Sequence, residues 1–587
     1  MNAGRPRYLD AAEDLRPNED QWNAYQSTGS RVILAGPGSG KTKTITVKIA
    51  KLLAEDVRRP QRIACITYSN ACVGELRARL TRLDVDDGDR LLLSTVHSFC
   101  LTELVLPYAA MAGIDVPNPL IVASPKQSKT LFEEAYGRHR RGPVPYNFRM
   151  ACDRLRRTIV DRDSRDWRNW PAMETNVVTT YESLLLQNGL IDFDGLVLVG
   201  LKLVEGHEWV RRAIQAKYPI VVIDEYQDLG LPLHRIVMAL FRAGVRILAV
   251  GDPDQSIYGF TGAQPRLLRA LAGLPGMESI TLKLNYRCAD RIITASRALL
   301  PHPTDFRSHD KRAGDIIVHR LECGLRQQAD YALGKLVHEL LAANPVWVPG
   351  DIAFLYRTMK EGTVISEAAD AQGMRYFRQD NGSPIKRTRL TAWLMDVARW
   401  CAGGWSSGEV SLSQLLNAWR KLYRLVTRES DLYAARKALI LTLFSLRDGN
   451  KPLHEWLGLL KCHVLDQMFQ QEPGLVDEKE PLDDLISKTA HGKPLQAFTV
   501  EIFGNQGKNP EQVNLMTLHS SKGLEFQAVI MIGLEKGEFP SSRDDTEEQR
   551  EEAARLFYVG ITRAKAQVHL VYNNLESPLI TAIRKVI

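Results

Sequence analysis

Residues 31–42 read RVILAGPGSGKT, and this stretch decides the fold class of the chain. An apolar run without polar alternation, Arg31–Ala35, leads directly into a glycine-rich turn and then into a helical pattern. Such runs are typical of strands buried on both faces of a parallel sheet. Glycines let the backbone approach an anion closely, and the exposed N–H groups at a helix start bind phosphate. The stretch therefore predicts an α/β fold with a phosphate site at the carboxyl end of a strand.

The residues of this turn predict a site for a nucleoside triphosphate. Lys41 is expected to reach the β- and γ-phosphates, and Thr42 is expected to hold Mg²⁺. The strict form of the pattern has glycine where this chain has Ala35. The residues assigned to ATP in this stretch are Ala35, Gly36, Pro37, Gly38, Ser39, Gly40, Lys41, Thr42 and Lys43.

A second stretch, PIVVIDEYQD at residues 219–228, ends an apolar run in acidic residues. Asp224 at the tip of the expected strand suits Mg²⁺ coordination together with Thr42 and water. Glu225 suits a base that orients water for in-line phosphoryl transfer. A metal-dependent nuclease site built from Asp224, Glu225 and Asp228 is the alternative. The phosphate loop upstream favours ATP hydrolysis over that alternative.

The 587 residues contain two sets of such apolar runs with helical patterns between them. Residues 101–190 and 380–510 break this alternation and are expected to be mainly helical. The sequence predicts an α/β fold with two parallel-sheet cores, each interrupted by a helical insertion. The expected strands are Arg31–Ala35, Arg62–Thr67, Leu91–Val96, Pro219–Ile223 and Val245–Val250 in the first core, and Asp315–His319, Asp351–Tyr356, Val513–Leu518, Ala528–Gly533 and Val568–Tyr572 in the second.

The composition of the chain argues against a metal-cluster protein, a secreted protein and a membrane protein. Hydrophobic residues make up 44% and charged residues 25%, as is ordinary for soluble globular domains. The eight cysteines form no C-x-x-C pair and have no zinc-site spacing, so no structural zinc or iron–sulfur cluster is expected. A signal peptide and a membrane-spanning run are both missing from the pattern, so a cytoplasmic protein is expected.

Basic residues gather in both expected insertions. The formal net charge is +7, and Arg138–Arg168 and Lys386–Lys437 each hold more basic than acidic residues. Each cluster on its own can be a solvated helix face. Two clusters together favour contacts with nucleic-acid phosphates.

Further segments, taken with the two stretches above, resemble the motifs of the superfamily 1 helicases of the UvrD/Rep/PcrA group. They occur in the family order and extend over nearly the whole chain. These segments are Leu15–Gln21, Thr67–Ala71, Ser94–Phe99, Ile191–Asp194, Gly251–Phe260, Leu284–Arg287, Leu355–Arg357, Thr517–Phe526 and Tyr558–Ala564.

The resemblance implies the domain organisation. Residues 1–98 and 191–284 would form a first RecA-like core, with 99–190 as its helical insertion. Residues 285–379 and 511–587 would form a second RecA-like core, with 380–510 as its insertion.

The resemblance also implies roles at the nucleotide, with ATP and Mg²⁺ as cofactors. Gln21 would read adenine, Tyr286 would stack on the base, and Glu525 would contact the ribose. Gln255 would couple the γ-phosphate to the DNA contacts. Two arginines would neutralise the charge of the transition state. The implied catalytic set is Lys41, Glu225, Gln255, Arg287 and Arg563.

DNA is the implied partner, as a single strand or a tailed duplex, and relatives move 3′ to 5′ along it. Tyr68, Tyr258 and Phe260 stand where the family stacks bases, an arrangement that tolerates any sequence. The implied contacts to backbone or sugar are Asn70, Thr95, His97, Thr517 and His519, and Arg357 is a further implied DNA-binding residue.

The chain departs from the family pattern in three places. Thr261 and Ala554 stand where relatives often have arginine, which removes positive charge near the coupling region. After Tyr572 only Asn573–Glu576 precedes Ser577–Pro578. That segment is too short for the hairpin with which relatives split a duplex. A reduced strand-separation pin is therefore expected.

Three functions remain open. The first is an ATP-driven 3′–5′ DNA translocase and helicase serving repair or replication. The second is a motor that serves a protein partner, such as the nuclease of a Gabija-type anti-phage defence complex. The third is an ATP-gated single-strand-binding or protein-displacement module that unwinds little on its own.

Overall fold

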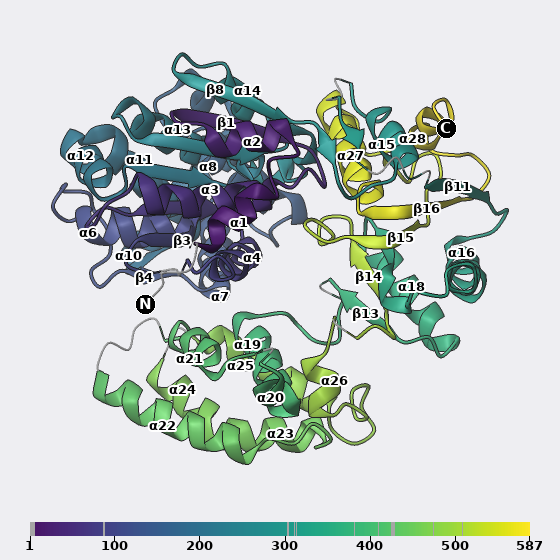
Figure 1. Cartoon of the computed structure of the whole chain (residues 1–587). Helices are drawn as coiled ribbons and strands as arrows, with labels where there is room; N and C mark the ends of the chain where they lie inside the picture. The colour runs from purple at the N-terminus through teal and green to yellow at the C-terminus, as the bar shows by residue number, and fades with distance from the viewer. Residues whose placement is uncertain are drawn as a thin grey trace. The chain divides into compact units, whose positions relative to one another are not determined.

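The computed structural model describes residues 6–85, 88–301, 305–309, 312, 314–380, 382–408, 410–423, 429–472, 475–507 and 509–587. The chain divides into two compact units (Figure 1). Unit 1 comprises Met1–Ile316, Lys536–Gln567 and Ser577–Ile587, and unit 2 comprises Ile317–Glu535 and Val568–Glu576.

The sheet of unit 1 has the strand order β3-β2-β6-β7-β1-β8, and all neighbouring strands are parallel. In the central strand β6, Val221 and Ile223 pack into one apolar core, and Ile220 and Val222 pack into another. Both faces of the sheet are therefore buried, which explains the continuous apolar runs of the sequence. The strands are β1 (Ser30–Ala35), β2 (Ile63–Thr67), β3 (Leu91–Thr95), β6 (Ile220–Ile223), β7 (Arg246–Gly251) and β8 (Met277–Leu282).

Helices cover both faces of this sheet. Residues of α3 (Lys41–Glu55) and α4 (Asn70–Thr81) fill one core, and residues of α11 (Phe193–Gly206) and α13 (Leu231–Arg242) fill the other. The remaining helices of the unit outside residues 101–190 are α1 (Arg7–Glu13), α2 (Glu19–Gln26), α5 (Val96–Phe99), α12 (Glu208–Lys217), α14 (Arg266–Ala272), α15 (Asp290–Arg297), α27 (Glu547–Ile561) and α28 (Pro578–Arg584).

The first insertion is mainly helical, as predicted, and has its own small core around Phe132, Tyr136 and Tyr181. Its main helices are α7 (Pro125–His139), α8 (Tyr146–Thr158), α9 (Arg165–Asn169) and α10 (Ala172–Gln187). Two short parallel strands, β4 (Ile121–Val122) and β5 (Leu190–Ile191), pair where the chain enters and leaves it.

The sheet of unit 2 has the order β11-β16-β15-β12-β14-β13. Its central strand β12 is parallel to both of its neighbours. The helices α16 (Leu325–Tyr331), α17 (Val337–Ala343) and α18 (Met359–Ala371) pack on it through a shared apolar core. The strands are β11 (Asp315–Arg320), β12 (Ile352–Tyr356), β13 (Tyr376–Gln379), β14 (Val513–Thr517), β15 (Phe526–Met531) and β16 (Ala564–Tyr572).

The second insertion packs around Trp419 and Trp456, both fully buried (green in Figure 1). Its helices are α19 (Arg389–Arg399), α20 (Trp405–Ser407), α21 (Leu412–Arg420), α22 (Glu429–Ser445), α23 (Leu453–Leu460), α24 (Asp466–Gln471), α25 (Val476–Lys488) and α26 (Val500–Gly504).

The predicted α/β class with two parallel-sheet cores is confirmed. All ten expected strands form, and two edge strands, β8 and β13, were not expected. Unit 1 also contains residues 285–316 and 536–567, which the sequence assigns to the second core, because they contact the phosphate loop and its surroundings. The four-part division of the chain stays a prediction.

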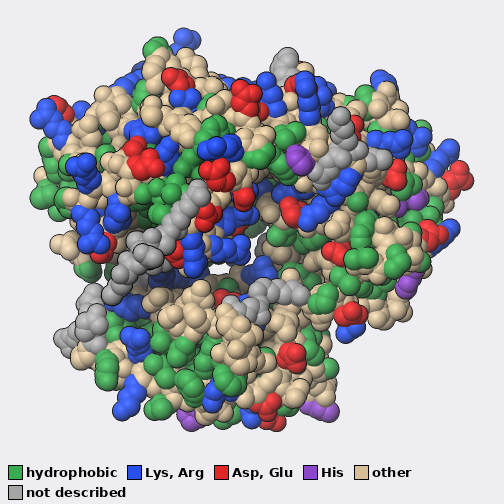
Figure 2. All heavy atoms as spheres, in the orientation of Figure 1, with side chains coloured by type: hydrophobic (Ala, Val, Ile, Leu, Met, Phe, Trp, Pro, Cys, Tyr) green, Lys and Arg blue, Asp and Glu red, His purple; other side chains and the backbone are tan. Residues whose placement is uncertain are grey.

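The basic stretch Arg138–Arg168 is only partly used inside the fold, because six of its ten arginines are exposed and the other four are partly or fully buried. Arg156 pairs with Glu182 and Asp192, Arg157 pairs with Asp194, and Arg138 pairs with Glu134. On the face shown in Figure 2, Lys and Arg side chains interleave with Asp and Glu over both units. The contacts of the exposed arginines with nucleic-acid phosphates stay a prediction.

The C-terminal segment lacks a hairpin, as expected: β16 ends at Tyr572 and α28 begins at Pro578. Within the described residues, no helix has both the length and the apolar character needed to cross a membrane.

Candidate functional site

The phosphate loop lies between β1 and α3, at the carboxyl edge of the unit 1 sheet. Gly40 precedes α3 with φ 77°, in the left-handed region. A Cβ atom there would lie 2.4 Å from Nε2 of Gln21, so only glycine fits. The amide of Gln21 donates to the Ser39 carbonyl over 2.8 Å. Gln21, predicted to read adenine, is therefore held against the loop.

A second contact with the loop comes from β9 (Leu284–Asn285) and the residue after it. Asn285 Nδ2 donates to the Pro37 carbonyl over 2.6 Å, and the Tyr286 N–H donates to the Gly38 carbonyl over 2.8 Å. The Tyr286 hydroxyl accepts from Asn18 Nδ2 at 2.9 Å, while 38% of the residue stays exposed. Gln21 and Tyr286 thus meet at the same loop, and the exposed ring has a face on which a base can stack.

The acidic residues follow β6 at the same edge of the sheet. Glu225 has φ 53°, a conformation that is costly for a residue with a side chain and is found at functional sites. Lys41 Nζ lies 3.3 Å from Glu225 Oε1, and both side chains are mostly buried. Burial, followed by the charge of Glu225, raises the pKa of Asp224 to about 7. A divalent cation would relieve this cost, so the donor set of Asp224 and Thr42 fits Mg²⁺.

Hydrogen bonds continue from Glu225 across the site. Gln227 Nε2 donates to Glu225 Oε2 over 2.6 Å, and Gln227 Oε1 accepts from the Asp252 N–H over 3.0 Å. Gln255 Nε2 donates to Asp252 Oδ2 over 2.5 Å, and Arg563 Nη2 donates to Gln255 Oε1 over 3.1 Å. One connected network therefore joins the phosphate-loop lysine to the buried arginine.

The arginines lie beside this network. Arg563 is 1% exposed, and burial together with the nearby Arg287 lowers its pKa. Arg287 Nη1 donates to the Thr562 carbonyl over 3.4 Å. Two neighbouring cations, one of them buried, favour an anion such as a phosphoryl group.

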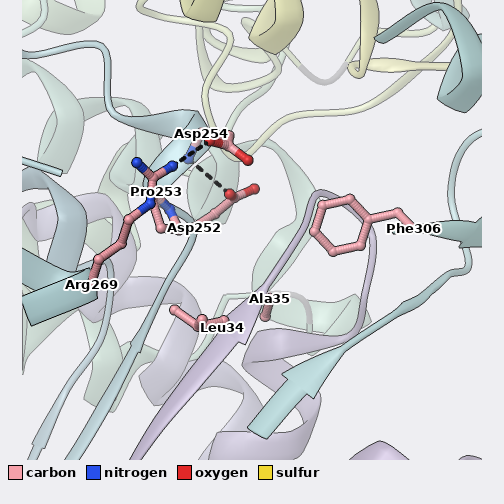
Figure 3. A pocket seen from close by; sticks show the side chains of 7 residues that line it. All are labelled: Leu34, Ala35, Asp252, Pro253, Asp254, Arg269 and Phe306. Atoms are coloured by element: carbon pink, nitrogen blue, oxygen red, sulfur yellow. Dashed lines mark hydrogen bonds and ion pairs between the residues drawn. The ribbon is translucent and has the colours of Figure 1, made fainter. Parts of the chain in front are cut away.

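A cavity of about 260 Å³ borders the loop between the ends of β1 and β7 (Figure 3). Ala35 and Asp252 belong to its wall, and Asp254 forms an ion pair of 3.1 Å with Arg269 there. The Phe306 ring lies against Gly36, where a Cβ atom would come within 2.4 Å of it. The loop backbone thus has an aromatic support on one side.

Several predicted DNA residues gather in unit 1. The rings of Tyr68 and Tyr258 stack at 5.2 Å with an angle of 27°. The rings of His97 and Phe193 form a T-shaped contact, and burial lowers the pKa of His97. Thr95 caps α5 by accepting from the Ser98 N–H.

Two further residues predicted to bind DNA also belong to unit 1, as does a lysine that was assigned to ATP. Asn70 is exposed at the start of α4. Phe260 belongs to a short 3₁₀ turn, Gly259–Thr261, and its side chain lies outside the described residues. Lys43, assigned to ATP, points to an exposed ion pair with Asp14 at 3.3 Å.

The remaining predicted residues belong to unit 2. Arg357 follows β12, and Thr517 ends β14, where it is the register partner of Tyr356. Thr517 Oγ1 accepts from the Ser520 N–H, and His519 lies in the same turn. Glu525 is exposed just before β15. Arg357, Thr517 and His519 therefore lie at the carboxyl edge of the second sheet, whereas Glu525 lies at the amino edge, where β15 begins.

Comparison with known proteins agrees with this geometry. Residues 17–273 match the UvrD/REP helicase N-terminal domain, and residues 482–575 match the UvrD-like helicase C-terminal domain. The chain belongs to the UvrD/Rep/PcrA-like helicase family.

Three similar curated proteins illustrate the relationship. The ATP-dependent DNA helicase PcrA of Bacillus subtilis (strain 168) is 25% identical, over 94% of this chain and 82% of its own. DNA helicase II of Haemophilus influenzae is 28% identical, over 93% and 82%. The ATP-dependent DNA helicase Rep of Escherichia coli (strain K12) is 26% identical, over 94% and 90%.

Within this helicase-family ATPase, sequence reasoning missed Gln227. The residue is fully buried and connects Glu225 to Asp252. Its position two residues after Glu225 was the only available signal, because the partner Asp252 becomes visible only when β6 and β7 pair.

Proposed function

We propose that this helicase-family member is an ATP-dependent DNA translocase and helicase that moves 3′ to 5′ on single-stranded or tailed duplex DNA. The observation that carries the proposal is the hydrogen-bonded network from Lys41 through Glu225, Gln227, Asp252 and Gln255 to Arg563. The names of the similar proteins, ATP-dependent DNA helicases, support the same activity.

The residues have distinct tasks at the nucleotide. Lys41 would bind the terminal phosphates, and Gln21 and Tyr286 would hold the base at the loop. Mg²⁺, held by Thr42 and Asp224, would neutralise phosphate charge. Glu225 would orient the attacking water, while Arg287 and Arg563 would stabilise the charge that develops.

Coupling to DNA would run through the loop that follows Gln255. Its Ser256 hydroxyl donates to the Gln227 carbonyl over 3.1 Å, and two residues later Tyr258 stacks on Tyr68. A strand that displaces or joins these rings would move the loop that carries Gln255. Hydrolysis would therefore depend on DNA, and successive cycles would produce stepping.

The test is ATP hydrolysis measured with and without single-stranded DNA of mixed sequence. We expect the DNA to raise kcat at least tenfold, because a translocase hydrolyses ATP mainly while it is bound to the strand along which it moves. ATP turnover that does not respond to DNA would contradict a translocase.

A second candidate is a motor of the same chemistry that serves a protein partner, such as a nuclease of an anti-phage complex, or a module that displaces proteins. The direct passage from β16 to α28 favours it, because a strand-splitting hairpin is missing there. Normal DNA-stimulated hydrolysis without displacement of any duplex would support this candidate. A cytoplasmic location fits either function.

A further inference from the structure

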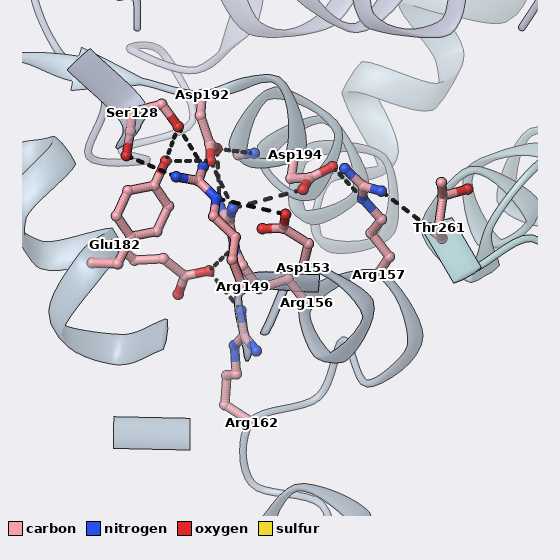
Figure 4. A network of polar contacts seen from close by, with 12 residues as sticks. Ser128, Arg149, Asp153, Arg156, Arg157, Arg162, Glu182, Asp192, Asp194 and Thr261 are labelled. Atoms are coloured by element: carbon pink, nitrogen blue, oxygen red, sulfur yellow. Dashed lines mark hydrogen bonds and ion pairs between the residues drawn. The ribbon is translucent and has the colours of Figure 1, made fainter. Parts of the chain in front are cut away.

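A buried ion-pair network connects the first helical insertion to the core of unit 1 (Figure 4). Arg156 of α8 donates to both carboxylate oxygens of Asp192, over 2.6 and 2.9 Å, and to Glu182 over 2.8 Å. Asp192 also caps α11 by accepting from the Gly195 N–H. The start of α11 is thereby fixed to α8.

The next residue of α8 extends the network to the loop of the DNA site. Arg157 Nε donates to Asp194 Oδ1 over 2.8 Å, and Arg157 Nη1 donates to the Thr261 carbonyl over 3.2 Å. A Cβ atom on Gly262 would lie 3.0 Å from Arg157 Cβ, so this loop packs directly on α8. One guanidinium therefore joins an acidic anchor to the loop backbone.

That loop carries an aromatic ring of the DNA site. The Thr261 N–H and the Ala263 N–H both donate to the Tyr258 carbonyl, and the Thr261 hydroxyl donates to it as well. Holding Thr261 in place thus also fixes the turn that presents Tyr258 to Tyr68. A pocket of about 120 Å³ lined by Tyr68, His97, Arg157, Asp194 and Thr261 adjoins this turn.

We propose that Arg157 is a positioning residue for DNA-stimulated ATP hydrolysis: anchored by Asp194, it fixes the Tyr258–Thr261 turn so that DNA at the aromatic rings acts on Gln255. This inference rests on the proposed function and adds the helical insertion to the coupling path. The Thr261 side chain carries no charge, and the guanidinium of Arg157 reaches its backbone carbonyl instead.

Geometry explains why arginine is needed at this position. The planar guanidinium offers donors in a fixed fork, so Nε and Nη1 reach two acceptors in different directions. The ammonium of lysine is a point charge on a flexible side chain, and it cannot reach both the Asp194 carboxylate and the Thr261 carbonyl. Asp194 is 13% exposed at its side chain, so its attraction for Arg157 is only weakly screened by water.

The first test is hydrogen–deuterium exchange of the turn without nucleotide or DNA. In Arg157→Gln, the amides of residues 259–263 should exchange at least about tenfold faster than in the wild type. The matched control is Arg154→Gln, which removes the same charge from the same helix at a 52% exposed side chain whose partner is Glu548. This control should leave the turn as protected as in the wild type.

The second test is hydrolysis at saturating single-stranded DNA. Arg157→Gln should lower the DNA-stimulated kcat about tenfold while KM for ATP changes less than twofold. Asp194→Asn should give a similar loss, and the double variant should lose little more than either single variant, because both act through one contact. Arg157→Lys should recover only part of the rate.

The outcomes separate the inference from the proposed function. If DNA does not stimulate ATP hydrolysis by the wild type, the proposed function is wrong, and this failure is independent of Arg157. If the wild type is stimulated and Arg157→Gln is stimulated equally, the inference is overturned. Unchanged hydrogen exchange of residues 259–263 in Arg157→Gln would overturn it as well. If Arg157→Gln unfolds at a clearly lower temperature than the wild type, Asp194→Asn replaces it in both tests.

Discussion

At the scale of single residues, Gln227 shows how a neutral side chain can set the geometry of a charged site. Its amide donates to Glu225 and its carbonyl oxygen accepts from the Asp252 backbone, so both ends are fixed. In the proposed mechanism Glu225 holds a water molecule in line with the phosphate, and small displacements of such a group are costly. Gln227 is therefore a positioning residue for hydrolysis.

Replacing Gln227 with glutamate tests this role with almost no change in volume. A carboxylate cannot donate to Glu225 and repels it, so kcat for ATP should fall about 10- to 100-fold. KM for ATP should change less than twofold, because Gln227 does not reach the phosphate loop. The control is Gln26→Glu, the same change at an exposed site beside Lys51, which should keep wild-type rates. A wild-type kcat in Gln227→Glu would rule the role out.

At the scale of elements, most strands could be predicted from the sequence, but the ion pairs that connect the first insertion to the rest of unit 1 could not. Strands buried on both faces, such as β6, can be recognised in the sequence as continuous apolar runs. The edge strands β8 and β13 do not, because part of each contacts water and their sequences, MESITL and YFRQ, mix polar with apolar residues. The arginines of α8 resembled a phosphate surface because their partners Glu182, Asp192 and Asp194 come later in the chain.

The buried Arg156 provides the prediction that belongs to this scale. Its side chain is 2% exposed, and Arg156→Met would leave Asp192 charged and buried without its partner. Burial acts to raise the pKa of Asp192, but the paired Arg156 lowers it, so the pair holds this carboxylate ionised. We expect the insertion to lose about 3–5 kcal/mol of local stability, measured by hydrogen exchange of α8 and α10.

The control for this prediction is Arg168→Met, which removes an exposed arginine of α9 and should cost no more than about 0.5 kcal/mol. Equal exchange in the two variants would mean that the ion pair adds nothing to the stability of the insertion.

At the scale of the whole molecule, the sequence predicted two parallel-sheet cores with helical insertions and the residues of the nucleotide loop. The structure adds the contacts that connect them within unit 1: Gln21 and Asn285 on the loop, Gln227 between the acidic residues, and Arg157 on the aromatic turn. These depend on side-chain packing between distant segments, which periodicity and spacing do not encode. Residues of the two carboxyl edges lie in different compact units.

The most direct measurement of the central claim is strand displacement on 3′-tailed and 5′-tailed duplexes, with ATP hydrolysis followed in the same tube. The wild type should displace only the 3′-tailed duplex while hydrolysing ATP. Glu225→Gln should lose both activities by about 100-fold or more while still binding ATP, because the base is removed and Lys41 remains. Displacement that favours the 5′-tailed duplex, or hydrolysis that persists in Glu225→Gln, would contradict the account.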